Sequence, residues 1–226
     1  MRLLAGDGLL AKGILAMIGA WEGGAPAERL MAALRAGAQA LREACRAAML
    51  ESMLRNDLSI DLALCLEVIR GKTAALMRAA CESGGLLAGA APARVQALGL
   101  YGEALGMAFQ IRDDLLPYTS DTRTIGKAIT SDANNRYPNL PILLAQSLAG
   151  DADRRRLQEL FSSTEDPPAV HRELSELLLR TGAIAEATRL AREHAASAHT
   201  ALMELPPSES RDRLAALVTT VVDRDH

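Results

Sequence analysis

The sequence has few aromatic residues and no excess of positive charge, and these two shortages argue against nucleic acid as a partner. Aromatic residues make up 3% of the 226 residues, too few for the stacking platforms that hold single strands. The formal net charge is -3, which gives no general attraction to nucleic acid or to an anionic membrane surface. No nucleic-acid partner is therefore expected.

Cysteines and long apolar runs are also scarce. Cys45, Cys65 and Cys81 are odd in number and lack the Cys-x-x-Cys spacing of many zinc sites. They are expected to be free thiols in a reducing compartment, which makes the cytoplasm the default location. No run of 18 apolar residues occurs, so no membrane span is expected.

What the chain does contain is helix-forming sequence. Its 226 residues, 49% hydrophobic and 23% charged, suffice for one globular domain with a large core, so residues 1–226 are expected to form a single domain. Nearly every long segment is rich in Ala, Leu, Arg and Glu, which predicts an all-α fold. Ser59 or Asp61 is expected to cap the third helix. The expected helices cover residues 9–21, 26–54, 60–80, 92–116, 141–149, 153–162, 171–179, 184–203 and 208–222.

Two adjacent carboxylates, Asp113 and Asp114, lie inside an apolar helix-forming segment, residues 108–117. Burial of unpaired carboxylates is costly, so the pair predicts a compensating metal ion, a Lys/Arg cluster or both. Lys72 upstream and Lys127 downstream are candidate cations, and the four side chains together suggest a site for a metal-bound polyanion. Mg²⁺ is the expected metal because it usually takes one or two carboxylates plus substrate phosphates. The residues alone also allow a structural ion network with Arg112, Arg123 or Lys127.

Pro117 lies one helical turn after Asp113, where a third carboxylate would complete a metal platform. A proline there cannot donate a hydrogen bond to the Asp113 carbonyl, so the helix is expected to kink or end. The polar stretch 118–139 that follows is expected to be a loop over the end of this helix, and loops of this length are usually functional or disordered.

Several motifs resemble, in the same order, those of the trans-isoprenyl diphosphate synthases, or polyprenyl synthetases. Residues 109–116, Phe-Gln-Ile-Arg-Asp-Asp-Leu-Leu, resemble the second aspartate-rich motif of that family. Residues 71–74, Gly-Lys-Thr-Ala, resemble the Lys-Thr-Ala element before it, and residues 101–110 resemble the helix that leads into it. Residues 4–11 are similar to the family's Ala-Gly-Asp helix, and residues 181–184 to part of its C-terminal pattern.

The resemblance implies an isoprenoid synthase fold, with helices around a central apolar cavity and acidic clusters at its mouth. It implies that Mg²⁺ links an allylic diphosphate to aspartates on two facing helices, and that departure of the diphosphate leaves an allylic cation. The metal residues that it implies are Asp113, Asp114 and Asp132. The residues that it implies for diphosphate binding and catalysis are Lys72, Gln110 and Lys127, together with Asp113.

The chain also departs from the family pattern. The first aspartate-rich motif, and with it the isopentenyl diphosphate site, should lie upstream of residues 4–11, so the N-terminal helices of the fold are expected to be missing. Pro117 stands where the family has a third Asp, and Tyr137 stands where it has a lysine. The Gly-Glu-x-x-Gln element is weakened to Ala-Ala-Met-Leu-Glu at residues 47–51.

These departures lead to the hypothesis of one subunit in a split or heteromeric, Mg²⁺-dependent isoprenoid synthase. The chain would bind and ionise an allylic diphosphate for chain elongation, while a partner chain supplies the first aspartate-rich motif and covers the apolar face of residues 9–21. Three alternatives remain: a terpene synthase subunit, a non-catalytic regulatory subunit, and a reading frame that starts further upstream. The histidines show no metal-ligand spacing and are expected at the surface; they are His171, His194, His199 and His226.

Overall fold

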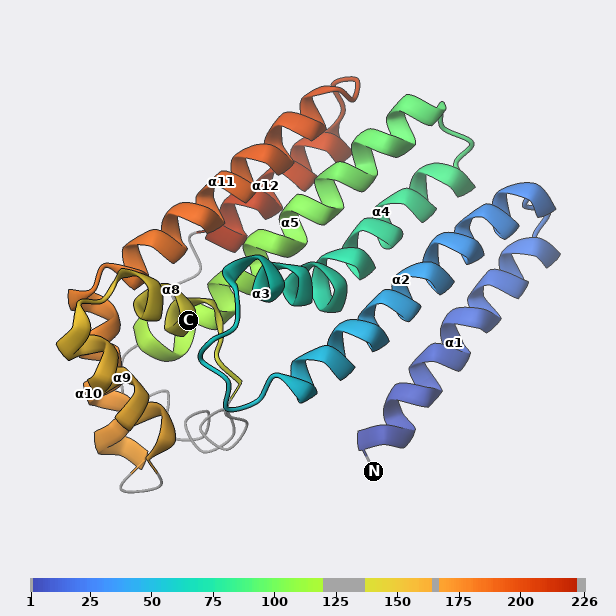
Figure 1. Cartoon of the computed structure of the whole chain (residues 1–226). Coiled ribbons are helices and arrows are strands. Elements are labelled where there is room, and N and C mark those ends of the chain that lie inside the picture. Colours follow the sequence, from blue (N-terminus) through green and yellow to red (C-terminus); the bar gives the residue numbers. More distant parts are fainter. Residues whose placement is uncertain (1, 120–136, 164–166, 223–226) are drawn as a thin grey trace.

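The computed structural model describes residues 2–119, 137–163 and 167–222, and all secondary structure within these ranges is helical. The long helices lie side by side in the order α1, α2, α4, α5 and α11, with α12 against both α11 and α5 (Figure 1). The all-α prediction is confirmed. The bounds are α1 (Arg2–Glu22), α2 (Ala27–Met53), α4 (Ala75–Leu87), α5 (Pro92–Thr119), α11 (Ala183–Met203) and α12 (Glu209–Val222).

Shorter helices gather at one end of this row (Figure 1). They are α3 (Leu62–Ile69), α8 (Leu140–Leu148), α9 (Asp151–Ser162) and α10 (Pro167–Arg180). A single π-helical turn, η1 (Arg70–Ala74), joins α3 to α4. The end of α5 that carries the two aspartates lies among these shorter helices, since α3, α8 and α10 all contact α5.

The single helix expected over residues 60–80 is wrong in its bounds and its continuity. The helical segment begins at Leu62, after the Asp61 carboxylate accepts a hydrogen bond of 3.0 Å from the Ala63 N–H, and continues through η1 to Leu87. A π turn changes the side-chain register, which a search for a 3.6-residue period does not detect. Gly71 permits the turn to lie against α2, because a Cβ there would come within 2.8 Å of the Ala47 Cβ.

Two hydrophobic cores meet on α5. Ile111 and Leu115 belong to the core that α5 shares with α3, α8, α9, α10 and α11. Tyr101 and Ala108 belong to the core shared with α11 and α12, where the Tyr101 hydroxyl donates to the Leu214 carbonyl at 2.9 Å. Packing in both cores fixes the position of α5, and therefore of the aspartates near its C-terminal end.

Pro117 does not end α5 where it stands, because the chain stays helical to Thr119. A proline so close to the end of a helix removes one hydrogen bond but has little helix left to disrupt. The Thr119 hydroxyl donates to the Leu115 carbonyl at 3.1 Å, within this last turn. His171 of α10 donates to the Pro117 carbonyl and stacks on the Tyr118 ring, with centroids 5.7 Å apart.

The expected surface position of His171 is wrong, since the side chain is half-buried against the end of α5. Burial lowers the pKa of His171, and it also lowers the pKa of His194, which is likewise partly buried. A stacked, neutral imidazole suits a packing role better than metal binding here. No sequence pattern indicated this role, because Tyr118 and His171 are separated by the whole of α8 and α9.

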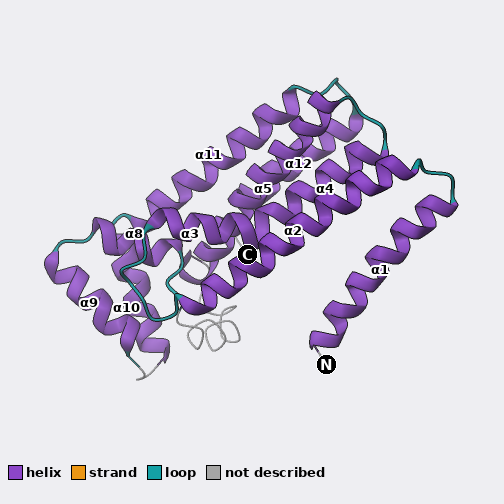
Figure 2. Cartoon of the chain, turned by 45° about the vertical axis from the view of Figure 1, so that its right-hand side comes forward, coloured by secondary structure: helices purple, strands orange, loops and turns teal. Residues whose placement is uncertain are grey.

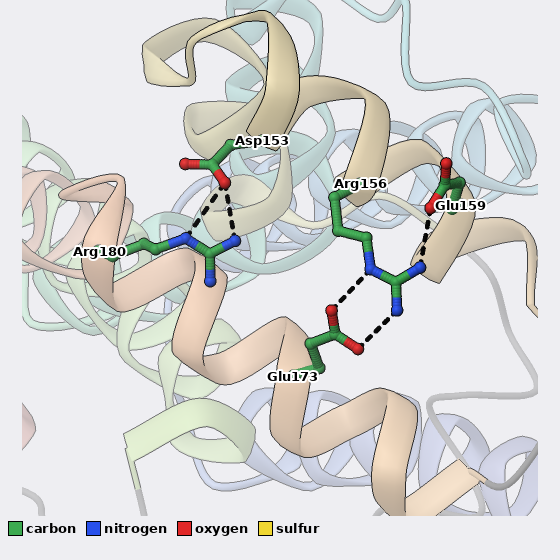
Figure 3. A network of polar contacts seen from close by, with 5 residues as sticks. All are labelled: Asp153, Arg156, Glu159, Glu173 and Arg180. Carbon is green, nitrogen blue, oxygen red and sulfur yellow. Dashed lines mark hydrogen bonds and ion pairs between the residues drawn. The ribbon is translucent and has the colours of Figure 1, made fainter.

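Ion pairs join α9 to α10, the helix that carries His171 (Figure 3). Arg156 donates to both carboxylate oxygens of Glu173, at 2.6 and 2.7 Å, and to Glu159 at 2.8 Å. Arg180 donates to one oxygen of Asp153 at 2.7 and 3.1 Å. These side chains are solvent-exposed, so water weakens each ion pair and each contributes little to the stability of the fold. The network therefore contributes more to the relative position of α9 and α10 than to the stability of the fold.

Helix α1 lies at the edge of the bundle (Figure 2), and many of its large apolar side chains are exposed. Leu9 is 70% exposed, Leu15 63% and Trp21 61%, and the neighbouring α2 exposes Met49 and Met53. So many exposed apolar side chains on two neighbouring helices favour an interaction surface. No helix in the described part of the chain is both long and apolar enough to cross a membrane.

Candidate functional site

Asp114 lies in the last third of α5 and is held by two hydrogen bonds. The Gln110 side-chain amide donates to its carboxylate at 3.0 Å, and the backbone N–H of Leu140, the first residue of α8, donates to it as well. Burial, and to a smaller extent the charge of Asp113, raises the pKa of Asp114 to about 7. The doublet therefore carries unfavourable negative charge that a cation would relieve.

Gln110 is oriented by η1 on its other side. The Thr73 hydroxyl donates to the Gln110 side-chain carbonyl at 2.7 Å, so the carbonyl faces Thr73 and the amide faces Asp114. This chain of hydrogen bonds depends on close approach of η1 to α5. Gly106 provides it, because a Cβ at that position would lie 2.6 Å from the Ala74 Cα.

Lys72 also projects from η1, toward the C-terminal end of α2. Its ammonium group donates to both carboxylate oxygens of Glu51, at 2.8 and 2.7 Å. The positive charge of Lys72 is close enough to lower the pKa of Asp114, although burial has the larger effect. Lys72, Gln110 and Asp114 therefore lie close together in the structure, and their roles in binding stay predictions.

Tyr137 enters the same site from the segment before α8. Its hydroxyl is buried beside the Cys65 thiol, and the negative charges of Glu51 and Asp114 interact electrostatically with the Tyr137 side chain. Burial raises the pKa of Tyr137 and raises that of Cys65 to about 12, so both groups stay neutral. A neutral phenol occupies the position where the family pattern has a lysine. The described cysteines are free thiols, as expected.

Lys127 and Asp132, predicted to bind diphosphate and metal, lie outside the described residues. Within residues 2–119, 137–163 and 167–222, no three His, Cys, Asp or Glu side chains gather closely enough to hold a metal ion. The adjacent carboxylates of Asp113 and Asp114 are thus the candidate metal ligands among the described residues, and their role stays a prediction.

A pocket of about 270 Å³ lies between α11 and α12, away from the doublet. It is lined by Arg192, Ala195, Ala196, His199, Val218, Thr219 and Val222. The central apolar cavity expected beside the aspartates is a different feature, and its presence stays a prediction.

The described chain is thus an all-α bundle in which the Lys72–Thr73 turn lies beside Gln110 and Asp114. The polyprenyl synthetase family pattern matches residues 3–178, and the chain belongs to this family. A short chain isoprenyl diphosphate synthase from Methanothermobacter thermautotrophicus is 35% identical over 161 residues, covering 71% of this chain and 49% of that protein. A (2E,6E)-farnesyl diphosphate synthase from Mycobacterium tuberculosis is 33% identical over 232 residues, covering 99% of this chain and 62% of that protein.

Solved structures agree. A polyprenyl synthase from Caulobacter crescentus, in complex with calcium and isoprenyl diphosphate, superposes with a TM-score of 0.86 at 33% identity over 99% of this chain and 66% of that one. A geranylgeranyl pyrophosphate synthase from Corynebacterium glutamicum, in complex with isoprenyl diphosphate and magnesium, gives 0.84 at 26% identity over 98% of this chain and 62% of that one. The chain therefore spans about half to two thirds of the length of these relatives.

Two contributors to the site were not predicted as site residues. Glu51 is the end of the weakened element at residues 47–51, and its contact with Lys72 depends on the packing of η1 against α2. Thr73 follows Lys72 in the Lys-Thr-Ala element, so its position was a usable signal, but the direction of its hydroxyl depends on the π turn.

Asp114→Asn is expected to raise the free energy of unfolding at pH 8 in metal-free buffer. The native pKa of Asp114 is about 7, above the ordinary value of 3.8, so as pH rises the unfolded chain loses this proton first and native stability falls until pH passes about 7. Asparagine cannot ionise, so the gain is on the order of 1 kcal/mol at pH 8 and vanishes below the ordinary carboxyl pKa. Urea unfolding at pH 8 and at a pH below the ordinary carboxyl pKa measures this gain in stability. A variant no more stable than the parent at pH 8 would contradict the desolvation of Asp114.

Proposed function

We propose that the chain binds the Mg²⁺-bound diphosphate of an allylic isoprenoid and takes part in its ionisation during prenyl transfer and chain elongation. The observation that carries this proposal is the convergence of Lys72, Gln110 and the Asp113–Asp114 doublet at the end of α5, in a member of the polyprenyl synthetase family. The named relatives are isoprenyl and farnesyl diphosphate synthases, which supports this substrate class. The free thiols are in keeping with a cytoplasmic location.

The donor set fits Mg²⁺. Asp113 and Asp114 offer hard oxygen ligands, and Mg²⁺ commonly takes one or two carboxylates and fills its other positions with water and phosphate oxygens. A raised pKa at Asp114 marks a carboxyl that gains from a neighbouring cation. When bound, the metal neutralises charge on the departing diphosphate.

The chain's own residues are proposed to bind the diphosphate and to position the metal ligands. Lys72 would bind phosphate oxygens as a point charge, and Lys127 would do the same. Gln110, held by Thr73, fixes the orientation of Asp114. Asp132 would be a further metal-binding residue.

A second polypeptide is proposed to complete the site. Among the described residues no three His, Cys, Asp or Glu side chains gather into a metal site, and large apolar side chains of α1 and α2 are exposed. We infer that a partner chain packs on these faces and contributes the first aspartate-rich motif. A subunit of this kind is unable to turn over substrate alone.

The test is to read the reading frame immediately upstream for an Asp-Asp-x-x-Asp motif and to co-express its product with the chain. Mg²⁺-dependent elongation of an allylic diphosphate by the pair, and by neither chain alone, is the expected result. Turnover by the isolated chain at ordinary enzyme rates, about 1–1000 per second, contradicts the partner proposal. A cyclic or linear hydrocarbon in place of a longer diphosphate identifies a terpene synthase subunit.

A non-catalytic regulatory subunit is the second candidate. Pro117 and Tyr137 favour it, because both replace family residues that bind metal or diphosphate in the resemblance described above. Asp113→Ala in the reconstituted complex separates the two functions. Undiminished activity supports regulation, and its loss supports catalysis.

A further inference from the structure

Lys72, which the proposed function assigns to the diphosphate, is already engaged by a carboxylate. Both oxygens of Glu51 lie within hydrogen-bond distance of its ammonium nitrogen, at 2.8 and 2.7 Å. A lysine ammonium has three donors, so this contact uses two of them. The anion that Lys72 binds in this structure is therefore the Glu51 carboxylate of the protein itself.

The contact is exchangeable. The side chain of Lys72 is 45% exposed and that of Glu51 25% exposed, so water reaches the pair and weakens it relative to a buried one. A phosphate oxygen makes the same charge-assisted hydrogen bond to an ammonium group that a carboxylate oxygen makes. A diphosphate with its metal can thus take over the position of Glu51.

The electrostatic surroundings make Glu51 an obstacle to an anion. Glu51 binds Lys72, whose charge also acts on Asp114. The charges of Glu51 and Asp114 both act on Tyr137 and Cys65. A diphosphate entering this site meets repulsion from Glu51 unless that side chain releases Lys72. The aspartates are offset by Mg²⁺, but Glu51 is offset by Lys72 alone among the described contacts.

We propose that Glu51 competes with the diphosphate for Lys72, so that binding exchanges an internal ion pair for an ion pair with the ligand. The inference rests on the proposed diphosphate site. It assigns Glu51 as a residue that sets affinity for the diphosphate by lowering it. If the Glu51–Lys72 ion pair only held α2 and η1 together, the opposite result would be expected. Its loss would loosen Lys72 and leave the affinity for the diphosphate unchanged or weaker.

The experiment is isothermal titration of the 226-residue chain with inorganic pyrophosphate in saturating Mg²⁺. Glu51→Gln is expected to tighten binding about fivefold, the upper range for removal of one partly exposed ion pair. Glu51→Asp, which keeps the charge on a shorter side chain, should fall between Glu51→Gln and the parent. Lys72→Gln should weaken binding, and the double variant Glu51→Gln/Lys72→Gln should bind no more tightly than Lys72→Gln alone.

Glu67→Gln is the matched control. Glu67 on α3 accepts a hydrogen bond of 2.6 Å from Arg46 on α2, so it forms another exposed ion pair with α2 and carries the same charge as Glu51. Glu67→Gln should leave pyrophosphate affinity within about twofold of the parent. Equal tightening by both variants would mean a general charge effect and would overturn the inference.

The same titrations also distinguish failure of the proposed role of Glu51 from failure of the proposed diphosphate site. Unchanged or weaker binding in Glu51→Gln, with weaker binding in Lys72→Gln, overturns the role of Glu51 and leaves the diphosphate site intact. Unchanged binding in Lys72→Gln overturns the assignment of Lys72 in the proposed function. Thermal unfolding shows whether each variant is folded. If Glu51→Gln is unstable, the pyrophosphate affinity of Glu51→Asp relative to the parent tests the role of Glu51 instead.

Discussion

Asp113→Asn is expected to weaken Mg²⁺-dependent binding of inorganic pyrophosphate to the chain by about a hundredfold. Loss of a residue that merely orients a metal ligand typically costs 10–100-fold in affinity, and loss of a ligand should reach the upper end of that range or exceed it. The effect should be larger than that of Asp114→Asn, whose side-chain carbonyl can still accept the Gln110 and Leu140 hydrogen bonds. Isothermal titration with and without Mg²⁺ measures it.

Asp212→Asn is the control for this result. Asp212 lies on α12, is 72% exposed and pairs with Arg211 at 3.6 Å, so its loss changes the net charge equally without touching the candidate site. It should leave the affinity unchanged. Binding by Asp113→Asn as tight as that of Asp212→Asn would remove Asp113 from the metal site.

Gly106→Ala is expected to lower the free energy of unfolding by about 2 kcal/mol. The added Cβ would lie 2.6 Å from the Ala74 Cα, 3.0 Å from its Cβ and 3.3 Å from its backbone nitrogen. Because these are mostly backbone atoms, η1 must move away from α5 as a unit. That movement separates Thr73 from Gln110, so pyrophosphate binding should weaken along with stability.

Gly84→Ala is the matched control, with the opposite expected sign. Gly84 is exposed inside α4, and a Cβ there meets nothing within 4 Å. Alanine should therefore stabilise the helix by about 0.5–1 kcal/mol. Urea unfolding of both variants compares them, and a Gly106→Ala protein as stable as Gly84→Ala would contradict the close approach of η1 to α5.

Sequence patterns were sufficient for the all-α fold. Helix-forming residues continue through the aspartates, and α5 extends to Thr119. Lys72 and Gln110 were assigned through ordered motifs, and the structure places Gln110 against Asp114 and the charge of Lys72 within its reach. The helix prediction succeeded because it depends on local residue type, whereas the roles of Lys72 and Gln110 stay predictions.

Features that depend on register and tertiary packing were not predictable. The π turn η1 gives no periodic signal, yet it aims Lys72 at Glu51 and Thr73 at Gln110. The contact of His171 with the end of α5 joins residues from distant helices. In each case, the side chain that matters is brought into place by a backbone approach that one sequence does not reveal.

The exposed faces of α1 and α2 link the fold to the proposed function. Leu15 and Trp21 on α1 and Met49 and Met53 on α2 present apolar side chains to solvent. A partner that covers these faces would also carry carboxylates to the site. Stability and diphosphate affinity are therefore expected to rise together when the partner binds.

The most direct test is a titration of a non-hydrolysable allylic diphosphate analogue with Mg²⁺, performed on the isolated chain and on its complex with the co-expressed partner. The account predicts Mg²⁺-dependent binding that is at least tenfold tighter in the complex, because opposing carboxylates complete the metal site there. Equal affinity in the two samples, or binding to neither, would contradict a diphosphate site shared between two chains.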